Sequence, residues 1–593
     1  MFKKLFKNIK SDKTMLLLML IVILAATLRF TWLGEVEVTA DEPLYSVRNI
    51  GWLDVLYGSD QPTVYHLLDK LPWWANLSFH DHPPLTFAIN YIIHKIFGIS
   101  LFVSRLGSVF FGIFSVILIF LVGKKMKNEK VGLLAAFIMA VSVMPVYISR
   151  IAIMESIALF FVLLTFYLFI LACDNIKYLT WFGVVVGLSL LAKYTAFFPL
   201  PIYLVYLLVY RRGYFKKFKF YLAIFLGLLV FSPVIIYNIA LYNNLGHFDL
   251  QFSFLLGQDS AQYWSNPLGK ELRGGIIKRI SGLMFYGSFL TPPFLFFFIF
   301  SLFVNLLEIR KKEDRNNRTR NLGLLISVMT VFLFSTFLIG SNFRFLVYPM
   351  PFFIILISLL FLNLYNLLGK KVFFVIFILF FAYELFFSIN VNHLYNKNNL
   401  LGWNRITYSK GYLIRPIGVE ELNQYFLQEF FGRKSYFQPI FANRNIQTKI
   451  TKILENKKDN DIDKEIYKAL LIHDERASIK TYEWIFSKYS FYMGWPYVGM
   501  DYFLENIDYF NEEEFGDVVF YYVLTLDGTE RNESRKSYII SDIYGDFLEK
   551  LGAEFEVIKN KKGEQAFKVY KANLDQVKSV KVNFNPSRAK DGR

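Results

Sequence analysis

The stretch MLLLMLIVILAATLRFTWL at residues 15–33 decides the fold, because it is apolar and long enough to cross a bilayer as a helix. The basic segment before it, with no convincing cleavage signal behind it, indicates an uncleaved membrane anchor. The chain then enters a run of acids, Glu35, Glu37, Asp41 and Glu42. Acids just outside a first span suggest chemistry at the membrane surface.

The composition of the 593 residues indicates a membrane protein, since 54% are hydrophobic, 19% aromatic and only 19% charged. We therefore predict a mostly α, polytopic helical membrane protein. The net charge of +17 does not point to nucleic acid. Lys and Arg cluster in short loops between apolar segments, as the positive-inside rule requires, and no basic stripe suggests a nucleic-acid partner.

About eleven apolar segments are predicted to span the membrane. They are 15–33, 101–123, 131–148, 156–173, 178–193, 195–210, 220–241, 288–307, 321–340, 345–368 and 371–390. The pair 178–193 and 195–210 is also compatible with one bent helix. Every second loop is basic apart from a weak loop at Asp174 and Lys177, which places the N-terminus in the cytoplasm and the C-terminus outside a plasma membrane.

Two domains follow from the change in composition, a transmembrane domain at 1–390 and an extracytoplasmic soluble α+β domain at 391–593. The first outer loop, 34–100, contains an amphipathic helix at 85–97 that is too short to span and begins after Pro83-Pro84. The soluble domain is expected to contain further elements. They are helices at 419–431, 463–471 and 542–551, a strand at 517–526, and a hairpin of 555–558 with 566–570.

A resident metal or cofactor is not expected. Cys173 is the single cysteine, so neither an intrachain disulfide nor a cysteine-ligated metal site is possible. His82, His247, Asp81 and Asp259 lack the tight spacing of metal ligands. Because no Gly-rich phosphate-binding loop is present, hydrolysis of a soluble nucleotide is not expected to drive the reaction.

Two acidic motifs in the first outer loop are the catalytic candidates. Asp41-Glu42 is followed by Pro43 and Tyr45, which give the chain a defined exit from the membrane. Asp81-His82 precedes Pro83-Pro84 in the same loop. A carboxylate at the mouth of a membrane cavity is suited to take a proton from an acceptor hydroxyl. The alternative is that these acids are solvated loop residues.

Four further ionisable residues lie at the predicted outer ends of spans, where charge is costly and usually functional. Arg150 and Glu155 flank the third and fourth spans, either as functional groups or as a buried structural pair. Lys193 and Arg344 are outer-side cations that would neutralise a lipid phosphate. The alternative for Lys193 is a lysine that snorkels to the interface.

Several strings in order resemble the GT-C superfamily of membrane glycosyltransferases. They are Asp41-Glu42-Pro43-Leu44-Tyr45, His82-Pro83-Pro84-Leu85, Phe97-Gly98-Ile99-Ser100 with Arg105-Leu106, Ser149 to Ser156, Gly187 to Tyr194, and Arg344 to Pro351. The resemblance covers about residues 10–390 and is strongest to protein O-mannosyltransferases and lipid A aminoarabinose transferases. Trp73-Trp74-Ala75-Asn76 lacks the Asp of the Trp-Trp-Asp signature of oligosaccharyltransferases and lies in the wrong part of the chain.

The resemblance implies an inverting sugar transfer from a polyprenyl-phosphate donor to an acceptor outside the membrane. In such enzymes the residue matching Asp41 acts at the acceptor, the one matching Asp81 shapes the site, and the one matching Lys193 contacts the donor phosphate. Glu155 departs from the Asp usual at this place. His82 matches the mannosyltransferases rather than the aminoarabinose transferases, which favours mannose or another hexose. The acceptor, whether protein, lipid or glycan, stays open.

A transporter or flippase of lipid-linked sugars is the alternative function. Such a protein would bury ionisable residues at mid-span and show matched, broken helices in two halves. Here the charged residues lie at the ends of predicted spans and no two-fold pattern appears. The sequence therefore favours the glycosyltransferase.

Overall fold

The computed structural model describes residues 12–39, 41–56, 62–258, 277, 290–310, 343–393, 416–458, 463–531 and 538–583. The chain divides into two compact units. The first comprises Met1–Val36 with Pro72–Leu413, and the second Glu37–Leu71 with Ile414–Arg593. The sequence suggested a boundary after residue 390 and assigned the whole loop 34–100 to the membrane domain. In the structure, Glu37–Leu71 instead groups with the C-terminal unit.

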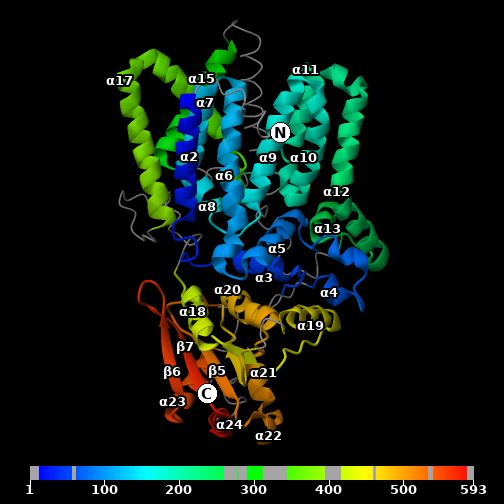
Figure 1. The fold of residues 1–593 in the computed structure, drawn as a ribbon, viewed down its shortest axis with the longest axis vertical. Coiled ribbons are helices and arrows are strands. Elements are labelled where there is room, and N and C mark those ends of the chain that lie inside the picture. Colours follow the sequence, from blue (N-terminus) through cyan, green and yellow to red (C-terminus); the bar gives the residue numbers. More distant parts are fainter. Residues whose placement is uncertain are drawn as a thin grey trace. The chain divides into compact units, whose positions relative to one another are not determined.

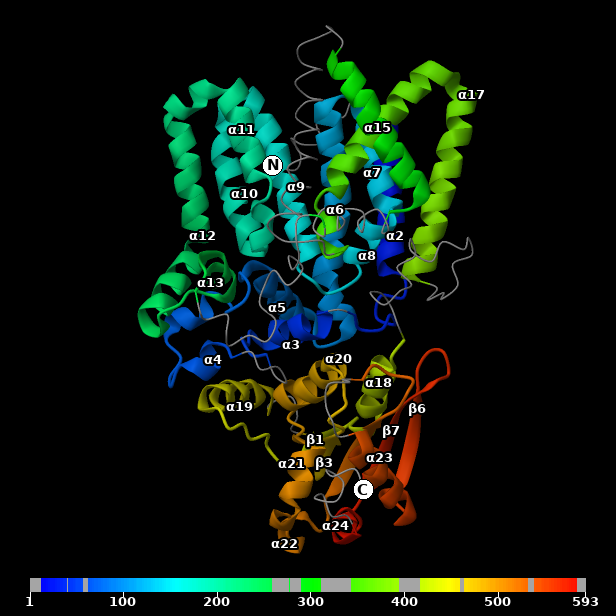
Figure 2. The same ribbon diagram turned by 180° about the vertical axis from the view of Figure 1, so that it is seen from behind.

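The first unit is helical, and its long helices run side by side (Figure 1, Figure 2). The α-helices are α2 (Asp12–Phe30), α5 (Leu85–Phe97), α6 (Leu101–Met126), α7 (Glu129–Val141), α8 (Val143–Ile148), α9 (Glu155–Asp174), α10 (Leu179–Ala192), α11 (Leu200–Tyr210), α12 (Phe218–Leu245), α13 (Leu250–Leu256), α15 (Pro292–Arg310) and α17 (Met350–Asn392). Within the described residues, α2, α6, α9, α12 and α17 are long and apolar enough to cross a membrane. The expected span 321–340 lies outside the described residues.

The expected amphipathic helix at 85–97 is confirmed as α5, with Pro84 at its N-cap and Gly98 at φ 84° beyond its end. Two long apolar stretches are interrupted. The span expected at 131–148 breaks at Ser142, whose ψ of 140° ends α7 and starts α8. The helix α17 is two helices joined at Gly369, whose φ of 75° turns the chain between the spans expected at 345–368 and 371–390. The segments 178–193 and 195–210 are separate helices, α10 and α11.

Helices α10 and α12 pack closely through glycine. A Cβ at Gly183 would lie 2.0 Å from the carbonyl oxygen of Ala223, and one at Gly187 would lie 2.6 Å from that of Gly227. Small residues let membrane helices approach in this way, since neighbouring backbones then meet without side chains between them. The contact fixes α10, and the chain leaves that helix at Lys193.

The second unit is built on a five-stranded sheet in the order β4-β3-β5-β7-β6 (Figure 2). Its strands are β3 (Ala469–His473), β4 (Tyr497–Gly499), β5 (Val519–Thr525), β6 (Glu554–Lys559) and β7 (Gln565–Ala572). Strand β3 pairs in parallel with β4 and β5, whereas β7 pairs antiparallel with β5 and β6. A separate parallel pair joins β1 (Arg433–Ser435) to β2 (Glu465–Tyr467). The α+β class and the predicted strand and hairpin are confirmed.

The helices of the second unit are partly as expected. Helices α18 (Val419–Glu429) and α23 (Tyr538–Lys550) confirm two predictions, and α19 (Arg444–Lys458) adds a third helix. The prediction of a helix at 463–471 is wrong, because this segment contributes to strands β2 and β3. Its end, from Ala469 to Leu471, is wholly buried, and a short buried apolar run fits a central strand as well as a helix.

The segment that carries Asp41 is fixed inside the second unit. Helix α3 (Glu42–Gly51) packs against the π-helix Tyr482–Ser487. The hydroxyl of Tyr492 donates to the carbonyl of Val47, and Arg48 forms a buried ion pair with Asp54, Nη2 to Oδ1 2.6 Å. Ahead of α3, the carboxylate of Glu37 accepts the backbone N–H groups of Ile417, Gly418 and Glu420. Burial, with nearby acids, nevertheless raises the pKa of Glu37 to about 7.

We expect Gly183→Ala to lower the stability of the protein by about 1–3 kcal/mol, because the added methyl group forces α10 away from α12. The thermal unfolding midpoint of the purified protein in detergent measures this effect. Gly213→Ala is the matched control, since a Cβ at Gly213 meets nothing within 4 Å. Equal midpoints for the two variants would contradict the close packing at Gly183.

Candidate functional site

Three charged side chains meet in the interior of the first unit. Glu155, the first residue of α9, is fully buried, and its Oε1 lies 2.6 Å from Nζ of Lys193. Nε of Arg344 lies 3.9 Å from the same oxygen. Within the described residues, the other oxygen, Oε2, has no hydrogen-bond partner. The cluster thus combines two cations with one carboxylate and leaves an acceptor atom available.

The break in the chain after α10 brings Lys193 to Glu155. Helix α10 ends at Ala192, Lys193 is extended with φ −164° and ψ 136°, and a short 3-10 helix, Tyr194–Phe197, follows. Successive side chains of an extended chain point to opposite sides. Lys193 therefore reaches Glu155, and Tyr194 reaches away from it. The hydroxyl of Thr86 in α5 donates to the carbonyl of Ala192, O to O 2.9 Å, and holds the break in place.

Tyr194 belongs to a second polar cluster, centred on Asp249. Asp249 caps α13 by accepting the backbone N–H of Phe252 at 2.9 Å. Its other oxygen accepts the hydroxyl of Tyr194 at 2.7 Å and the amide of Asn238 at 3.0 Å. Burial and, less strongly, the charge of Asp81 raise the pKa of Asp249 to about 6. Asp249 is therefore a buried acid that loses its proton at a higher pH than an exposed aspartate does.

Asp81 and His82 are paired, with Asp81 Oδ2 2.7 Å from Nδ1 of His82. Asp81 is buried, and His82 is partly exposed. Their loop docks on the start of α13, since the carbonyl of His80 accepts the N–H of Leu250 and that of Asp81 accepts the side-chain amide of Gln251. Hydrogen bonds therefore join the loop that carries the Asp81–His82 pair to the helix that Asp249 caps.

Arg150 is buried at the end of the first helix. Its Nη1 donates to the carbonyls of Leu28, Arg29 and Thr31 at 2.9–3.0 Å. These carbonyls lie at the C-terminal end of α2, where backbone acceptors lack helical partners. Arg105 acts similarly on the next turn, donating to the carbonyls of Leu33 and Val36. Both arginines therefore hold the chain where it leaves the first helix.

Asp41 and Glu42 lie in the second unit. The carboxylate of Glu42 is fully buried and accepts the N–H of Thr39 at 3.1 Å, which closes the turn that leads into α3. The carbonyl of Asp41 accepts the N–H of Tyr45. Asp41 is half-buried, so it sits at the end of a rigid helix rather than on a solvated loop. Glu42 has a structural role in this turn.

Sequence reasoning did not assign Asp249, Tyr194 or Asn238 to the site. The signal available was an acid placed three residues after the glycine that ends a long apolar helix, at Gly246. Among the described residues, no group of three or more His, Cys, Asp or Glu side chains is arranged to hold a metal ion. Asp259, one of the metal candidates weighed from the sequence, lies outside the described residues.

A family model described as dolichyl-phosphate-mannose-protein mannosyltransferase matches residues 81–237. This stretch contains the Asp81–His82 pair, Glu155, Lys193 and Tyr194, whereas Arg344, Asn238 and Asp249 lie beyond its end. No curated protein matches the chain.

Solved structures are similar to this chain. ArnT from Cupriavidus metallidurans bound to undecaprenyl phosphate is 11% identical with a TM-score of 0.50, covering 93% of this chain and 97% of that one. Its apo form is 10% identical with a TM-score of 0.50, covering 94% and 98%. The apo oligosaccharyltransferase of Archaeoglobus fulgidus is 12% identical with a TM-score of 0.46, covering 87% and 70%.

The chain thus shares the fold of ArnT, and its residues 81–237 are similar to the mannosyltransferase family model, as the resemblance to the GT-C superfamily of membrane glycosyltransferases implies. Its long apolar helices are those of an integral membrane protein. The resemblance noted in the sequence is therefore confirmed.

We expect Lys193→Met to destabilise the protein by about 3–5 kcal/mol, because it leaves the Glu155 carboxylate buried and poorly compensated. The double variant Glu155→Gln/Lys193→Met removes both charges and should recover most of the loss. Thermal unfolding midpoints in detergent measure both effects, with the exposed Lys177→Met as the control. A double variant as unstable as Lys193→Met would show that the pair is not the source of the loss.

Proposed function

We propose that this protein transfers a sugar from a polyprenyl-phosphate donor to an acceptor hydroxyl, with inversion at the anomeric carbon. The observation that carries the proposal is the buried cluster of Glu155, Lys193 and Arg344, in which two cations surround one carboxylate. Support comes from the similar fold of ArnT, whose structure contains undecaprenyl phosphate. The same fold class makes a lipid-linked donor chemically reasonable.

Lys193 and Arg344 are the proposed contacts for the donor phosphate. The three side chains together carry one net positive charge, so the cluster favours an anion. Because Lys193 is buried, its attraction for the leaving phosphate is screened far less than that of a surface lysine would be. The Glu155 Oε2 atom, which has no hydrogen-bond partner among the described residues, is suited to accept a hydroxyl of the donor sugar.

Asp41 is the proposed base at the acceptor, and Asp81 supports the site. The acceptor oxygen attacks the anomeric carbon while the bond from that carbon to the phosphate oxygen breaks. The electron pair of this bond leaves with the polyprenyl phosphate, and the acceptor proton passes to the Asp41 carboxylate. A phosphate monoester is a good leaving group, so cations around it replace a strong general acid.

Mannose or another hexose is the proposed sugar, and the acceptor is a protein, lipid or glycan. His82 matches the protein O-mannosyltransferase motif, and the description of the matched family model includes dolichyl-phosphate-mannose. The proposed reaction uses no metal or other cofactor.

The proposed orientation places the N-terminus in the cytoplasm and the transfer reaction on the outer face of the plasma membrane. The basis is the distribution of basic residues, since the end of α6 and the start of α7 carry Lys124, Lys125, Lys127 and Lys130. The polar clusters instead follow the C-terminal end of α10 and precede α13. On the same distribution of basic residues we propose that the C-terminal residues 391–593 lie outside the membrane.

We expect Asp41→Asn to fold normally and to lose at least a hundredfold in transfer rate, since an amide cannot accept the acceptor proton. The assay supplies purified protein with radiolabelled polyprenyl-phosphate-mannose and measures mannose incorporated into membrane acceptors. Asp69→Asn, an exposed acid of the same unit, is the control. Near-normal turnover in Asp41→Asn would remove the base assignment.

We expect loss of Lys193 to weaken donor binding about tenfold or more, because a charge-assisted hydrogen bond to the phosphate is lost. Binding of polyprenyl phosphate to purified Lys193→Ala measures this. The charge-free double variant Glu155→Gln/Lys193→Met repeats the test in a background that keeps its stability. Acceptor affinity should change less than twofold. Wild-type donor affinity in both variants would overturn the phosphate role.

A further inference from the structure

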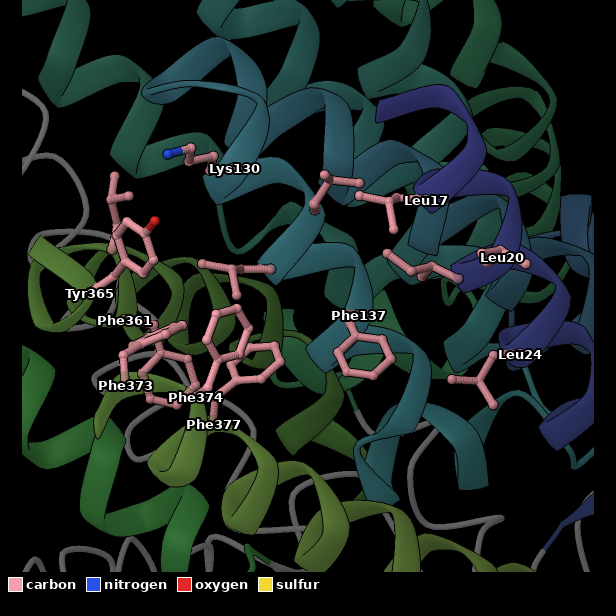
Figure 3. A pocket seen from close by; sticks show the side chains of 14 residues that line it. Leu17, Leu20, Leu24, Lys130, Phe137, Phe361, Tyr365, Phe373, Phe374 and Phe377 are labelled. Carbon is pink, nitrogen blue, oxygen red and sulfur yellow. The ribbon is translucent and has the colours of Figure 1, made fainter. Parts of the chain in front are cut away.

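An apolar groove of about 500 Å³ runs between helices α2, α7 and α17 of the first unit (Figure 3). Fourteen residues line it, and Lys130 and Tyr365 carry the polar side-chain atoms among them. The others are Leu17, Leu20, Ile21, Leu24, Leu133, Leu134, Phe137, Phe361, Leu362, Phe373, Phe374 and Phe377. The groove belongs to neither polar cluster of the candidate site.

The polar atoms lie at one end of the groove. Lys130, in the first turn of α7, places its Nζ 5.2 Å from the centre of the Tyr365 ring. Lys130 is exposed, and Tyr365 is half-buried. Figure 3 shows Lys130 and Tyr365 near each other and Leu24 well away from them. The groove therefore has a polar end and an apolar body.

The polar end coincides with the basic end of the bundle. The hydroxyl of Thr14, near the start of α2, donates to Glu129 at 3.0 Å, and Lys124 pairs with the same carboxylate at 3.0 Å. The starts of α2 and α7 and the end of α6 therefore meet beside Lys130. The lysines of this corner attract anions, and lipid headgroups carry such charge.

Aromatic rings shape the body of the groove. Phe373 contacts both Tyr365 and Phe361, with ring centroids 5.3 and 6.2 Å apart, across the turn of α17. Phe377 stacks against Phe137 of α7 at 6.2 Å. These contacts join the two halves of α17 to α7, so the walls are held by ring packing.

The groove is long enough to hold part of one acyl chain. From Leu17 to Leu24 the wall spans seven residue-to-residue steps of α2, about 10 Å at the helical rise of 1.5 Å per residue. This is less than the roughly 15 Å of one leaflet. A polyprenyl chain with many isoprene units would extend far beyond it.

We propose that this groove binds an anionic phospholipid, with an acyl chain along the apolar walls and the phosphate diester at Lys130 and Tyr365. Lys130 supplies the charge, the Tyr365 hydroxyl a hydrogen-bond donor, and the apolar body the contact with the chain. The site is separate from the donor-phosphate cluster, and the proposal does not rest on the proposed function.

Photo-crosslinking tests the proposal on the full chain in detergent. Phosphatidylglycerol with a diazirine in its acyl chain should label peptides of α7 and α17, and unlabelled phosphatidylglycerol should compete at least tenfold better than phosphatidylcholine. Lys130→Gln should reduce labelling at least fivefold, and Leu134→Trp, which fills the groove, should do the same. Lys127→Gln, an exposed lysine outside the groove, should label as wild type.

Three results would overturn the proposal. Equal competition by phosphatidylcholine would remove the headgroup preference, and undiminished labelling in Lys130→Gln would remove the lysine. Stronger competition by undecaprenyl phosphate than by phosphatidylglycerol would make the occupant a polyprenyl lipid. The competition series uses the unaltered protein, so it decides the question even if a variant does not fold.

Discussion

The buried ion pair of Glu155 with Lys193 is the interaction on which the first unit depends. Desolvation of a charged group costs several kcal/mol, and in the interior of a membrane protein water does not offset this cost. Each partner must therefore arrive at a fixed position. Glu155 does so as the first residue of α9, and Lys193 as the first residue after α10, so the pair requires both helices to begin or end there.

Helix ends supply most of the polar groups of the candidate site, among them Glu155, Lys193 and Asp249. In a bilayer, backbone that leaves a helix must find other partners, which is tolerated where it lines a polar interior. Here the carbonyl of Ala192 accepts the hydroxyl of Thr86, and a carbonyl at the end of α2 accepts the guanidinium of Arg150. At the start of α13, a backbone N–H donates to Asp249. At these chain breaks, backbone groups that have no helical partner bond to side chains instead. The same breaks carry ionisable side chains of the candidate site.

The sequence predicted the apolar helices and the interfacial helix α5, because hydropathy and period depend on neighbouring residues. It also selected Glu155, and it selected Lys193 and Arg344 together as cations for a lipid phosphate. It did not reveal their pairing, since Glu155 and Lys193 are 38 residues apart and only packing brings them together. The assignment of the Asp41 segment to the second unit was equally hidden. That assignment depends on contacts such as Tyr492 with Val47, which no local pattern encodes.

Two lysines of this molecule are proposed to meet phosphates, and their surroundings set different rules for each. Lys193 is buried and paired with Glu155, so its ammonium group is held in one position and its charge is little screened by salt. Removal of this charge would destabilise the protein. Lys130 is exposed beside a tyrosine ring, so the same charge is weakened by salt and costs little when unoccupied. A substrate that must be oriented for displacement requires the first arrangement. A lipid that exchanges with the bilayer is served by the second.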